Sequence, residues 1–195
     1  MEEEESQLTP AQLIYAYSNG YFPMADDPED GGEIFWHRPN QRGVIPLESF
    51  HISKNLKRLW RNHSYQLKVN TAFKEVMRAC AERDRTWINE EIIQAYCTLQ
   101  EMGYAISFEV WEGIRLVGGL YGVTLGKAYF GESMFSRKTN TSKLALIHLV
   151  EYLKSNGYTL LDTQYLNNHL EQFGATEIPD KKYMEQLEVA LANSL

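Results

Sequence analysis

Cysteine pairs, long apolar runs and metal-ligand spacings are all missing from this sequence of 195 residues. The two cysteines, Cys80 and Cys97, form no CxxC pair, which indicates small buried thiols in a reducing compartment and no disulfide scaffold or zinc site. The five histidines show no HxH or HExxH spacing, so we expect no metal. No run reaches the roughly 18 apolar residues of a membrane span, so we expect no membrane association.

The marks of a secreted protein are missing as well. The first residues, MEEEESQ, are acidic and polar, the opposite of a secretory signal, and we expect a cytoplasmic protein. The chain is instead rich in apolar residues, at 44% of the total, which is enough to form a proper core and argues against disorder. Its length suits one large domain, or one domain with a small partner.

Acidic residues are absent from one window of this acidic chain. The net charge is −7, yet the segment from Ser49 to Lys74 has no acid and six bases, so it carries +6 and the remainder −13. The bases are Lys54, Lys57, Arg58, Arg61, Lys68 and Lys74. Such a stripe can receive a phosphate backbone, although most runs of this kind are only a solvated face. Charge alone leaves both interpretations open.

Hydrophobic periodicity divides the chain into two parts. In the first, Thr9-Pro10 is typical of a helix start, residues 33–50 predict two short strands, and SKNLKRLWRN predicts a helix with bases around its apolar face. We therefore expect a small α/β subdomain at residues 1–62. Residues 63–195 predict an α+β domain with the order strand, helix, helix, three strands joined by hairpins, helix, strand, helix. Gly118, Gly119 and Gly131 inside strands predict a bulge or a close backbone approach.

A short apolar strand, YTLLDTQ, ends in two polar residues that share a face. Side chains alternate along a strand, so Asp162 and Gln164 point the same way and Thr163 points the opposite way. A carboxylate and a carboxamide that leave an apolar strand together are a candidate catalytic pair. The alternative is a strand that simply ends in polar residues with structural hydrogen bonds.

The element order of residues 63–195 resembles the acyltransferase fold of the GCN5-related N-acetyltransferases. Those enzymes hold the pyrophosphate of coenzyme A on backbone N–H groups of a [RQ]xxGx[GA] turn at the start of the main helix. The corresponding junction in this chain, FSRKTNTSK, contains no glycine. The resemblance therefore implies the same architecture with a different acyl donor.

A series of short strings carries a closer resemblance. In chain order they are NGYFPM, WHRPNQRGVIP, HISKNLKR, TWI, VGGLYGV, GESMFSR, LLDTQ and FGATEIP. From about Leu8 to Leu187 they are similar to the leucyl/phenylalanyl-tRNA–protein transferase family, and GESMFSR followed by D-x-Q is the specific part. Met24, His37 and Asp180 depart from the family pattern. By resemblance, these departures bear on the detailed shape of the aminoacyl pocket and on part of the tRNA contact.

This resemblance implies an activity. The enzyme would move leucine or phenylalanine, sometimes methionine, from charged tRNA to the α-amino group of a protein that begins with arginine or lysine. The product would enter the N-degron pathway of protein degradation. The implied partners are aminoacyl-tRNA and the acceptor protein, no cofactor is implied, and we expect a monomer. Two alternatives on the same fold stay open: an acyl-coenzyme A N-acetyltransferase with a degraded cofactor loop, and a non-catalytic RNA- or peptide-binding module.

The resemblance also gives roles to the polar candidates. Asp162 and Gln164 match the proposed catalytic pair of the family. Glu132, an acid within a glycine- and aromatic-rich strand, needs a partner if it is buried. That partner would be the α-amino group of the aminoacyl moiety or the basic side chain of the acceptor. The alternative for Glu132 is an internal ion pair with Arg137 or Lys143.

Apolar and basic residues complete the predicted site. Residues on strands, a loop and a helix could converge into a soft apolar pocket for the aminoacyl side chain, with ordinary core packing as the alternative for each. They are Trp87, Leu120, Tyr129, Met134, Phe135 and Leu153, with Trp36 and Met24 at the rim. Trp87 would stack on, or pack beside, the terminal adenine of tRNA. The phosphates of the acceptor stem would be contacted by Lys54, Lys57, Arg58 and Arg61.

Overall fold

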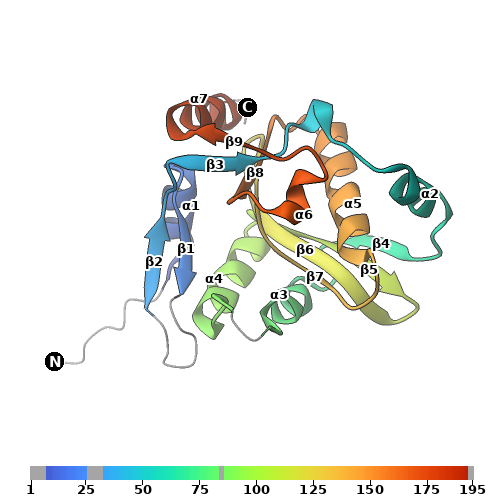
Figure 1. Ribbon diagram of the computed structural model, residues 1–195. Coiled ribbons are helices and arrows are strands. Elements are labelled where there is room, and N and C mark those ends of the chain that lie inside the picture. Colours follow the sequence, from blue (N-terminus) through green and yellow to red (C-terminus); the bar gives the residue numbers. More distant parts are fainter. Residues whose placement is uncertain (1–7, 26–32, 84–85, 193–195) are drawn as a thin grey trace.

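The computed structural model describes residues 8–25, 33–83 and 86–192 (Figure 1). In these ranges the chain forms a seven-stranded sheet, ordered β4-β5-β6-β7-β8-β3-β9, and a two-stranded sheet of β1 and β2. Neighbours in the large sheet are antiparallel except β7 and β8, which run parallel. The strands are β1 (Phe22–Ala25), β2 (Ile34–His37), β3 (Gln41–Val44), β4 (Gln66–Val69), β5 (Ala105–Glu112), β6 (Arg115–Leu125), β7 (Ala128–Ser136), β8 (Leu160–Gln164) and β9 (Thr176–Pro179).

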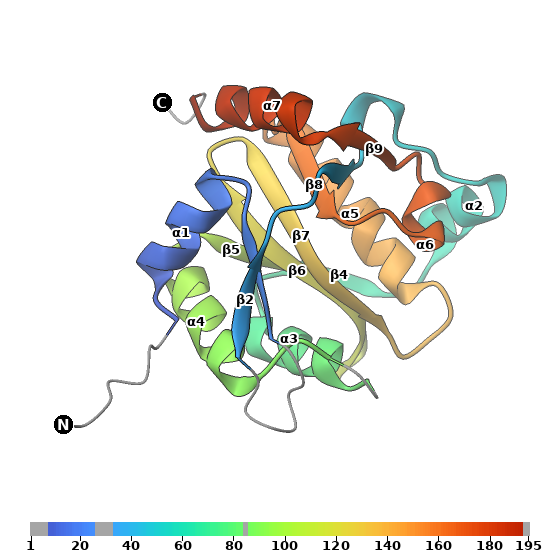
Figure 2. The ribbon, with the colours of Figure 1, turned by 60° about the vertical axis from the view of Figure 1, so that its left-hand side comes forward.

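Helices cover both faces of the large sheet, as Figures 1 and 2 show from two directions. One apolar core joins the sheet to α1, α3, α4 and α7, and a second core joins the other face to α2, α5 and α6. The helices are α1 (Pro10–Ser18), α2 (Lys54–Asn62), α3 (Phe73–Ala81), α4 (Glu90–Glu101), α5 (Thr141–Ser155), α6 (Asn168–Glu171) and α7 (Asp180–Ala192), with a short 3-10 helix, η2 (Leu47–Ser49). The architecture is α+β with a mixed sheet.

Local sequence explains where several helices begin. Thr9 and Gln12 form a reciprocal capping box at the start of α1, and Pro10 fits the first turn because it has no N–H to satisfy. The side chain of Asn89 accepts the N–H of Ile92 at 2.8 Å and so caps α4. These caps satisfy backbone donors that a helix start would otherwise leave without a partner.

Two glycines of β6, Gly118 and Gly122, allow close approach, and the sequence predicts this for Gly118 but not for Gly122. A Cβ on Gly118 would lie 2.5 Å from the side chain of Thr141, the first residue of α5. A Cβ on Gly122 would lie 2.2 Å from the carbonyl oxygen of Phe130, at the point where the pairing of β6 with β7 shifts register. The first glycine lets α5 pack directly on the sheet, and the second accommodates a bulge.

Strands β7 and β8 part partway along their length. Their parallel pairing joins Ala128–Phe130 to Leu160–Asp162 and then ends. Strand β7 continues to Ser136 and β8 continues to Gln164, so both have residues beyond the paired segment. The opening between the two strands lies at the ends that carry the candidate polar residues.

The predicted order of elements from residue 63 onward is confirmed, and so are the helix at residues 54–62 and the two short strands before it. The sequence does not predict β1 or β9. The boundary near residue 62 stays a prediction, and extensive contacts cross it. Strand β3 pairs with both β8 and β9, and Tyr17 of α1 reaches the β7 residue Glu132.

Candidate active site

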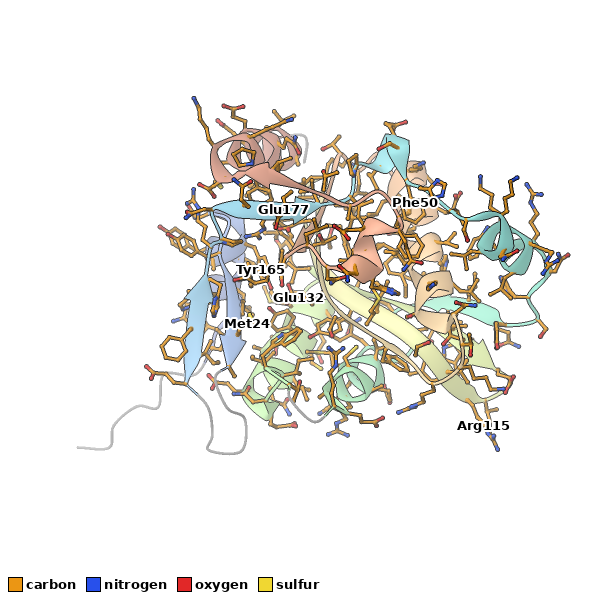
Figure 3. All side chains as sticks on the ribbon, viewed as in Figure 1. Met24, Phe50, Arg115, Glu132, Tyr165 and Glu177 are labelled. Atoms are coloured by element: carbon orange, nitrogen blue, oxygen red, sulfur yellow. The ribbon has the colours of Figure 1, made fainter. Side chains whose placement is uncertain are left out.

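A cavity of about 750 Å³ opens where β7 and β8 part. That volume is within the usual range for a small-molecule site. Figure 3 labels three of its lining residues, Met24, Glu132 and Tyr165, which come from three separate segments of the chain. The lining residues are Met24, Arg83, Trp87, Leu120, Tyr121, Gly131, Glu132, Ser133, Met134, Leu146, Leu149, Leu161, Thr163, Gln164, Tyr165, Asn167, Asn168, His169 and Leu170.

One part of the cavity wall is aliphatic. Leu120 on β6, Met134 on β7, Leu146 and Leu149 on α5, and Leu161 on β8 all line it, and they belong to or pack against the core beneath α5. A wall of leucine and methionine can accept both branched and aromatic side chains because these residues have no polar atoms that need partners and methionine is flexible. Polar groups of β7 and β8 lie along the same cavity.

Asp162 is fully buried and does not line the cavity. The guanidinium of Arg42 binds it in a bidentate ion pair, with Nε to Oδ1 at 2.9 Å and Nη2 to Oδ2 at 2.6 Å. Tyr183 donates its hydroxyl to Oδ2 at 2.7 Å, and the backbone N–H of Gln164 donates to Oδ1 at 2.7 Å. Each carboxylate oxygen therefore accepts two hydrogen bonds from the protein, and the group is held rather than available to a ligand.

Gln164 lines the cavity and is held in an uncommon backbone conformation. Its φ is +63°, in the left-handed region that costs a residue with a side chain roughly 1–2 kcal/mol. The hydrogen bond from its N–H to Asp162 stabilises this conformation. Its side-chain NH₂ donates to Oε1 of Glu132 at 2.8 Å, which leaves the amide oxygen of Gln164 as the group able to accept from a ligand.

Glu132 faces the cavity without a cationic partner among the described residues. Tyr17 donates to its Oε1 at 2.5 Å, and Tyr96, which itself makes a short hydrogen bond to Tyr17, lies 3.5 Å from Oε2. Burial raises the pKa of Glu132 to about 8, although the hydrogen bond from Tyr17 acts to lower it. A carboxyl group of this kind is ready to ionise when a cation reaches the cavity.

The internal ion pairs that were the alternative for Glu132 are not formed. Arg137 pairs with Glu82 at 2.9 Å, and the ammonium of Lys143 donates to Gln172 at 2.9 Å. Both basic side chains are therefore engaged elsewhere on the surface.

The structure brings most of the predicted pocket together and corrects part of it. Met24, Trp87, Leu120 and Met134 line the cavity with Glu132 and Gln164. Tyr129, Phe135 and Leu153 are instead buried in the two cores, because their strand positions and helix face turn them away from the opening. Trp36 is 40% exposed on β2 and does not line the cavity.

The predicted phosphate contacts share one helix. Lys54, Lys57, Arg58 and Arg61 are all exposed on α2, while Leu56 of the same helix is buried against the core. In the described part of the chain, none of the four forms an ion pair with a carboxylate. Helix α2 therefore presents four uncompensated positive charges to solvent.

Four residues that support the site are not among the sequence candidates. Arg42 and Tyr183 hold Asp162, while Tyr17 and Tyr96 contact Glu132. The arginine gave one signal, because it is a charged residue that directly precedes the apolar run Gly43-Val44-Ile45. The tyrosines gave none, since each looks like an ordinary apolar-face residue of its helix.

The described ranges contain no group of three or more His, Cys, Asp and Glu side chains placed to hold a metal ion. They also contain no helix with the length and apolar character needed to cross a membrane.

Comparison with known proteins gives both family and distant matches. Residues 44–188 match the family model described as leucyl/phenylalanyl-tRNA protein transferase, and residues 6–40 match the model of its N-terminal domain. A leucyl/phenylalanyl-tRNA–protein transferase of Paramagnetospirillum magneticum is 50% identical over 191 residues, which is 96% of this chain and 91% of that protein.

Solved structures match more weakly. The structure of L-PGS from Bacillus licheniformis aligns with 85% of this chain and 56% of its own, at 15% identity and a TM-score of 0.41. A functionally unknown conserved protein from Staphylococcus epidermidis aligns with 90% of this chain and 66% of its own, at 10% identity and a TM-score of 0.45. TM-scores this low do not define a shared fold. The sequence matches do define a relationship: the chain belongs to the leucyl/phenylalanyl-tRNA–protein transferase family.

Proposed function

We propose that this protein transfers leucine or phenylalanine, and in some cases methionine, from aminoacyl-tRNA to the α-amino group of proteins that begin with arginine or lysine. The observation that carries the proposal is the cavity between β7 and β8, which joins an aliphatic wall to Glu132 and Gln164. The relative that is 50% identical over 191 residues is named a leucyl/phenylalanyl-tRNA–protein transferase, which supports aminoacyl transfer from tRNA to protein. Such transfer marks the acceptor for degradation through the N-degron pathway.

The reaction is aminolysis of an activated ester. The acceptor α-amine has a reference pKa of about 7.7–8.0, so an appreciable fraction is unprotonated near neutral pH. The amine nitrogen attacks the ester carbonyl carbon and forms a C–N bond, and the bond between that carbon and the 3′ oxygen of the terminal ribose breaks. The proton that the amine loses passes to the leaving 3′ oxygen. Positioning and charge stabilisation supply most of the acceleration, so no nucleophilic side chain is needed.

Gln164 positions the attacking amine. Because its NH₂ donates to Glu132, its amide oxygen accepts a hydrogen bond from the amine and directs the lone pair at the ester carbon. Asp162 acts through Gln164, since it accepts the Gln164 N–H and touches no ligand itself. Of the predicted pair, Gln164 is thus the group in the cavity, and Asp162 is the buried carboxylate that positions Gln164.

Glu132 supplies negative charge at the same end of the cavity. An incoming ammonium, either the α-amino group of the aminoacyl moiety or the basic side chain of the acceptor, stabilises the ionised form of Glu132, which releases its proton to solvent. The aliphatic wall holds the leucine or phenylalanine side chain. Trp87 packs beside the terminal adenine, and the bases of α2 contact phosphates of the acceptor stem.

The parting of two parallel strands beside a long helix supports assignment of residues 63–195 to the acyltransferase fold of the GCN5-related N-acetyltransferases, with residues 1–62 as an N-terminal subdomain. A monomer in the cytoplasm that uses no cofactor is the form we propose. Coenzyme A is not the donor, since the first turn of α5 has no glycine and the N–H of Ser142 is already bonded to Ser136.

A transfer assay tests this proposal. The protein is incubated with radiolabelled Leu-tRNA or Phe-tRNA and a peptide that begins with Arg, and in parallel with the same peptide beginning with Ala. Label is expected to appear on the Arg peptide alone. No label on either peptide would contradict the proposal, and stabilisation of the protein by acetyl-coenzyme A in a thermal-shift experiment would favour an N-acetyltransferase instead.

A further inference from the structure

Arg83 is the only lysine or arginine among the described residues that line the cavity. It follows α3, and its side chain is held against β7. Its Nε donates to the carbonyl oxygen of Cys80 at 2.8 Å, and its Nη2 donates to Ser133 Oγ and to the carbonyl oxygen of Met134, each at 2.8 Å. The guanidinium is therefore fixed at the cavity mouth, one residue away from Glu132 along β7.

The charge of Arg83 is not neutralised by the part of the chain that the structure describes. Its acceptors are two carbonyl oxygens and a hydroxyl, and the neighbouring Glu82 pairs with Arg137 instead. The residue is also exposed. A planar guanidinium that is pre-positioned, charged and open to solvent is suited to a phosphate because little side-chain freedom is lost on binding.

An aromatic plane lies beside this charge. The Cζ atom of Arg83 is 5.6 Å from the ring centroid of Trp87, and both residues line the cavity. A nucleotide presents a flat base and a phosphate on the same ribose. The pair Trp87 and Arg83 offers matching groups, an indole for the base and, for the phosphate, the two N–H donors of Nη1 that the other contacts of Arg83 leave free.

We propose that Arg83 binds the phosphate on the 5′ side of the terminal nucleoside of the aminoacyl-tRNA. This rests on the proposed function, because it places the esterified ribose between Arg83 and Gln164. The site distinguishes an aminoacylated nucleotide from an aminoacylated nucleoside. It is separate from α2, whose bases serve the acceptor stem.

Two minimal donors test the assignment. One is adenosine esterified with leucine at its ribose 3′ oxygen, and the other is the same compound with a 5′-phosphate. The value of kcat/KM for transfer to an Arg peptide is measured for the wild-type protein, for Arg83→Met and Arg83→Lys, and for Arg137→Met as a control arginine outside the cavity. Transfer from intact Leu-tRNA is measured alongside.

The wild-type protein is expected to prefer the phosphorylated donor by about tenfold or more, mainly through KM. In Arg83→Met the phosphorylated donor loses far more activity than the nucleoside donor, so this preference falls below about twofold; Arg83→Lys retains part of the preference, and Arg137→Met retains all of it. If Arg83 only fastens α3 to β7, both donors lose activity equally, and that result overturns the assignment.

Two other outcomes distinguish a failure of the Arg83 phosphate site from a failure of the proposed transferase function. A wild-type protein that transfers from Leu-tRNA but treats both small donors alike overturns the Arg83 assignment alone. A wild-type protein that does not transfer from Leu-tRNA overturns the proposed function and the phosphate site together.

Discussion

Asp162 is a buried carboxylate whose hydrogen-bond partners all come from the protein, and Arg42 is its counter-ion. Removing one partner of a fully buried ion pair leaves the other charged and unsolvated, which typically costs about 3–5 kcal/mol. We therefore expect Arg42→Met to lower the free energy of unfolding by that amount, as measured by urea denaturation. Transfer is lost at temperatures where the variant is still folded, because Gln164 is no longer held.

A double variant separates stability from positioning. Arg42→Met combined with Asp162→Leu replaces the ion pair with apolar groups of similar size, which should recover most of the stability. It does not restore an acceptor for the Gln164 N–H, so transfer should stay low. Full activity in this double variant would show that Asp162 plays no part in positioning Gln164.

The left-handed backbone of Gln164 leads to a prediction about stability alone. Glycine tolerates a φ of +63° without strain, whereas alanine does not. Gln164→Gly should therefore be more stable than Gln164→Ala by about 1 kcal/mol, although glycine usually destabilises a strand. The comparison is made by thermal or urea denaturation, and an alanine variant that is the more stable of the two would contradict it.

The raised pKa of Glu132 predicts a pH dependence of stability. With a folded pKa of about 8 and an unfolded value near 4.3, the folded state holds one more proton between those limits, so stability falls as pH rises through that window. Glu132→Gln cannot ionise. Its stability relative to wild type should therefore increase from about pH 5 to about pH 8, by at most about 1.4 kcal/mol per pH unit.

Urea denaturation of both proteins across this range measures the difference. Glu82→Gln is a suitable control, since Glu82 is exposed and, among the described residues, its ion-pair partner is Arg137. If the difference in the free energy of unfolding between Glu132→Gln and wild type does not change with pH, Glu132 is already ionised in the free protein.

At the scale of elements, α2 is a basic surface whose charges are free of internal partners in the described structure. Replacing Lys57, Arg58 and Arg61 with alanine should weaken binding of charged tRNA. Each lost phosphate contact reduces the slope of log K against log salt by roughly 0.7–0.9, so the triple variant should be about 2 to 3 units less steep. Binding is measured by filter retention or fluorescence over a salt series.

A matched control removes the same charge elsewhere. Arg78, Arg115 and Lys154 are exposed on α3, β6 and α5, and their replacement by alanine should leave the slope nearly unchanged. Equal effects of the two triple variants would mean that net charge, rather than the surface of α2, governs binding.

Elements with strong periodicity could be predicted from the sequence, and short ones could not. The hairpin strands β5 to β7 and the helix α5 follow from local patterns of about ten residues. Strands β1 and β9 have four residues each, contain proline, and exist because β2 and β3 supply their partners. Their formation depends on tertiary pairing that no local pattern records.

At the scale of the whole molecule, the site is assembled from segments far apart in the chain. Gln164, Glu132, Leu120 and Met134 belong to short strings that are distinctive in the sequence, so their part of the cavity could be predicted. The lining residues from α5 and from the segment after β8 were not among the sequence candidates. Arg42 meets Asp162 across 120 positions, and Tyr17 meets Glu132 across 115. Such contacts depend on how β3 and α1 dock on the sheet, so the supporting residues could not be predicted.

The same assembly explains the three predicted pocket residues that proved to be core. Tyr129, Phe135 and Leu153 have the right composition and lie on the right elements, but the cavity is open only where β7 and β8 part. The position of that opening along the strands is a property of the complete sheet.

The central claim is that Gln164, held in the cavity between β7 and β8, positions the amine that takes the amino acid from tRNA. The most direct test is the single-turnover rate of labelled leucine transfer from Leu-tRNA to an Arg peptide by wild type and by Gln164→Gly, with tRNA binding and unfolding measured on the same samples. We predict that the variant folds, binds tRNA like wild type and transfers at least about a hundredfold more slowly. Transfer at the wild-type rate by a folded Gln164→Gly protein would contradict the account.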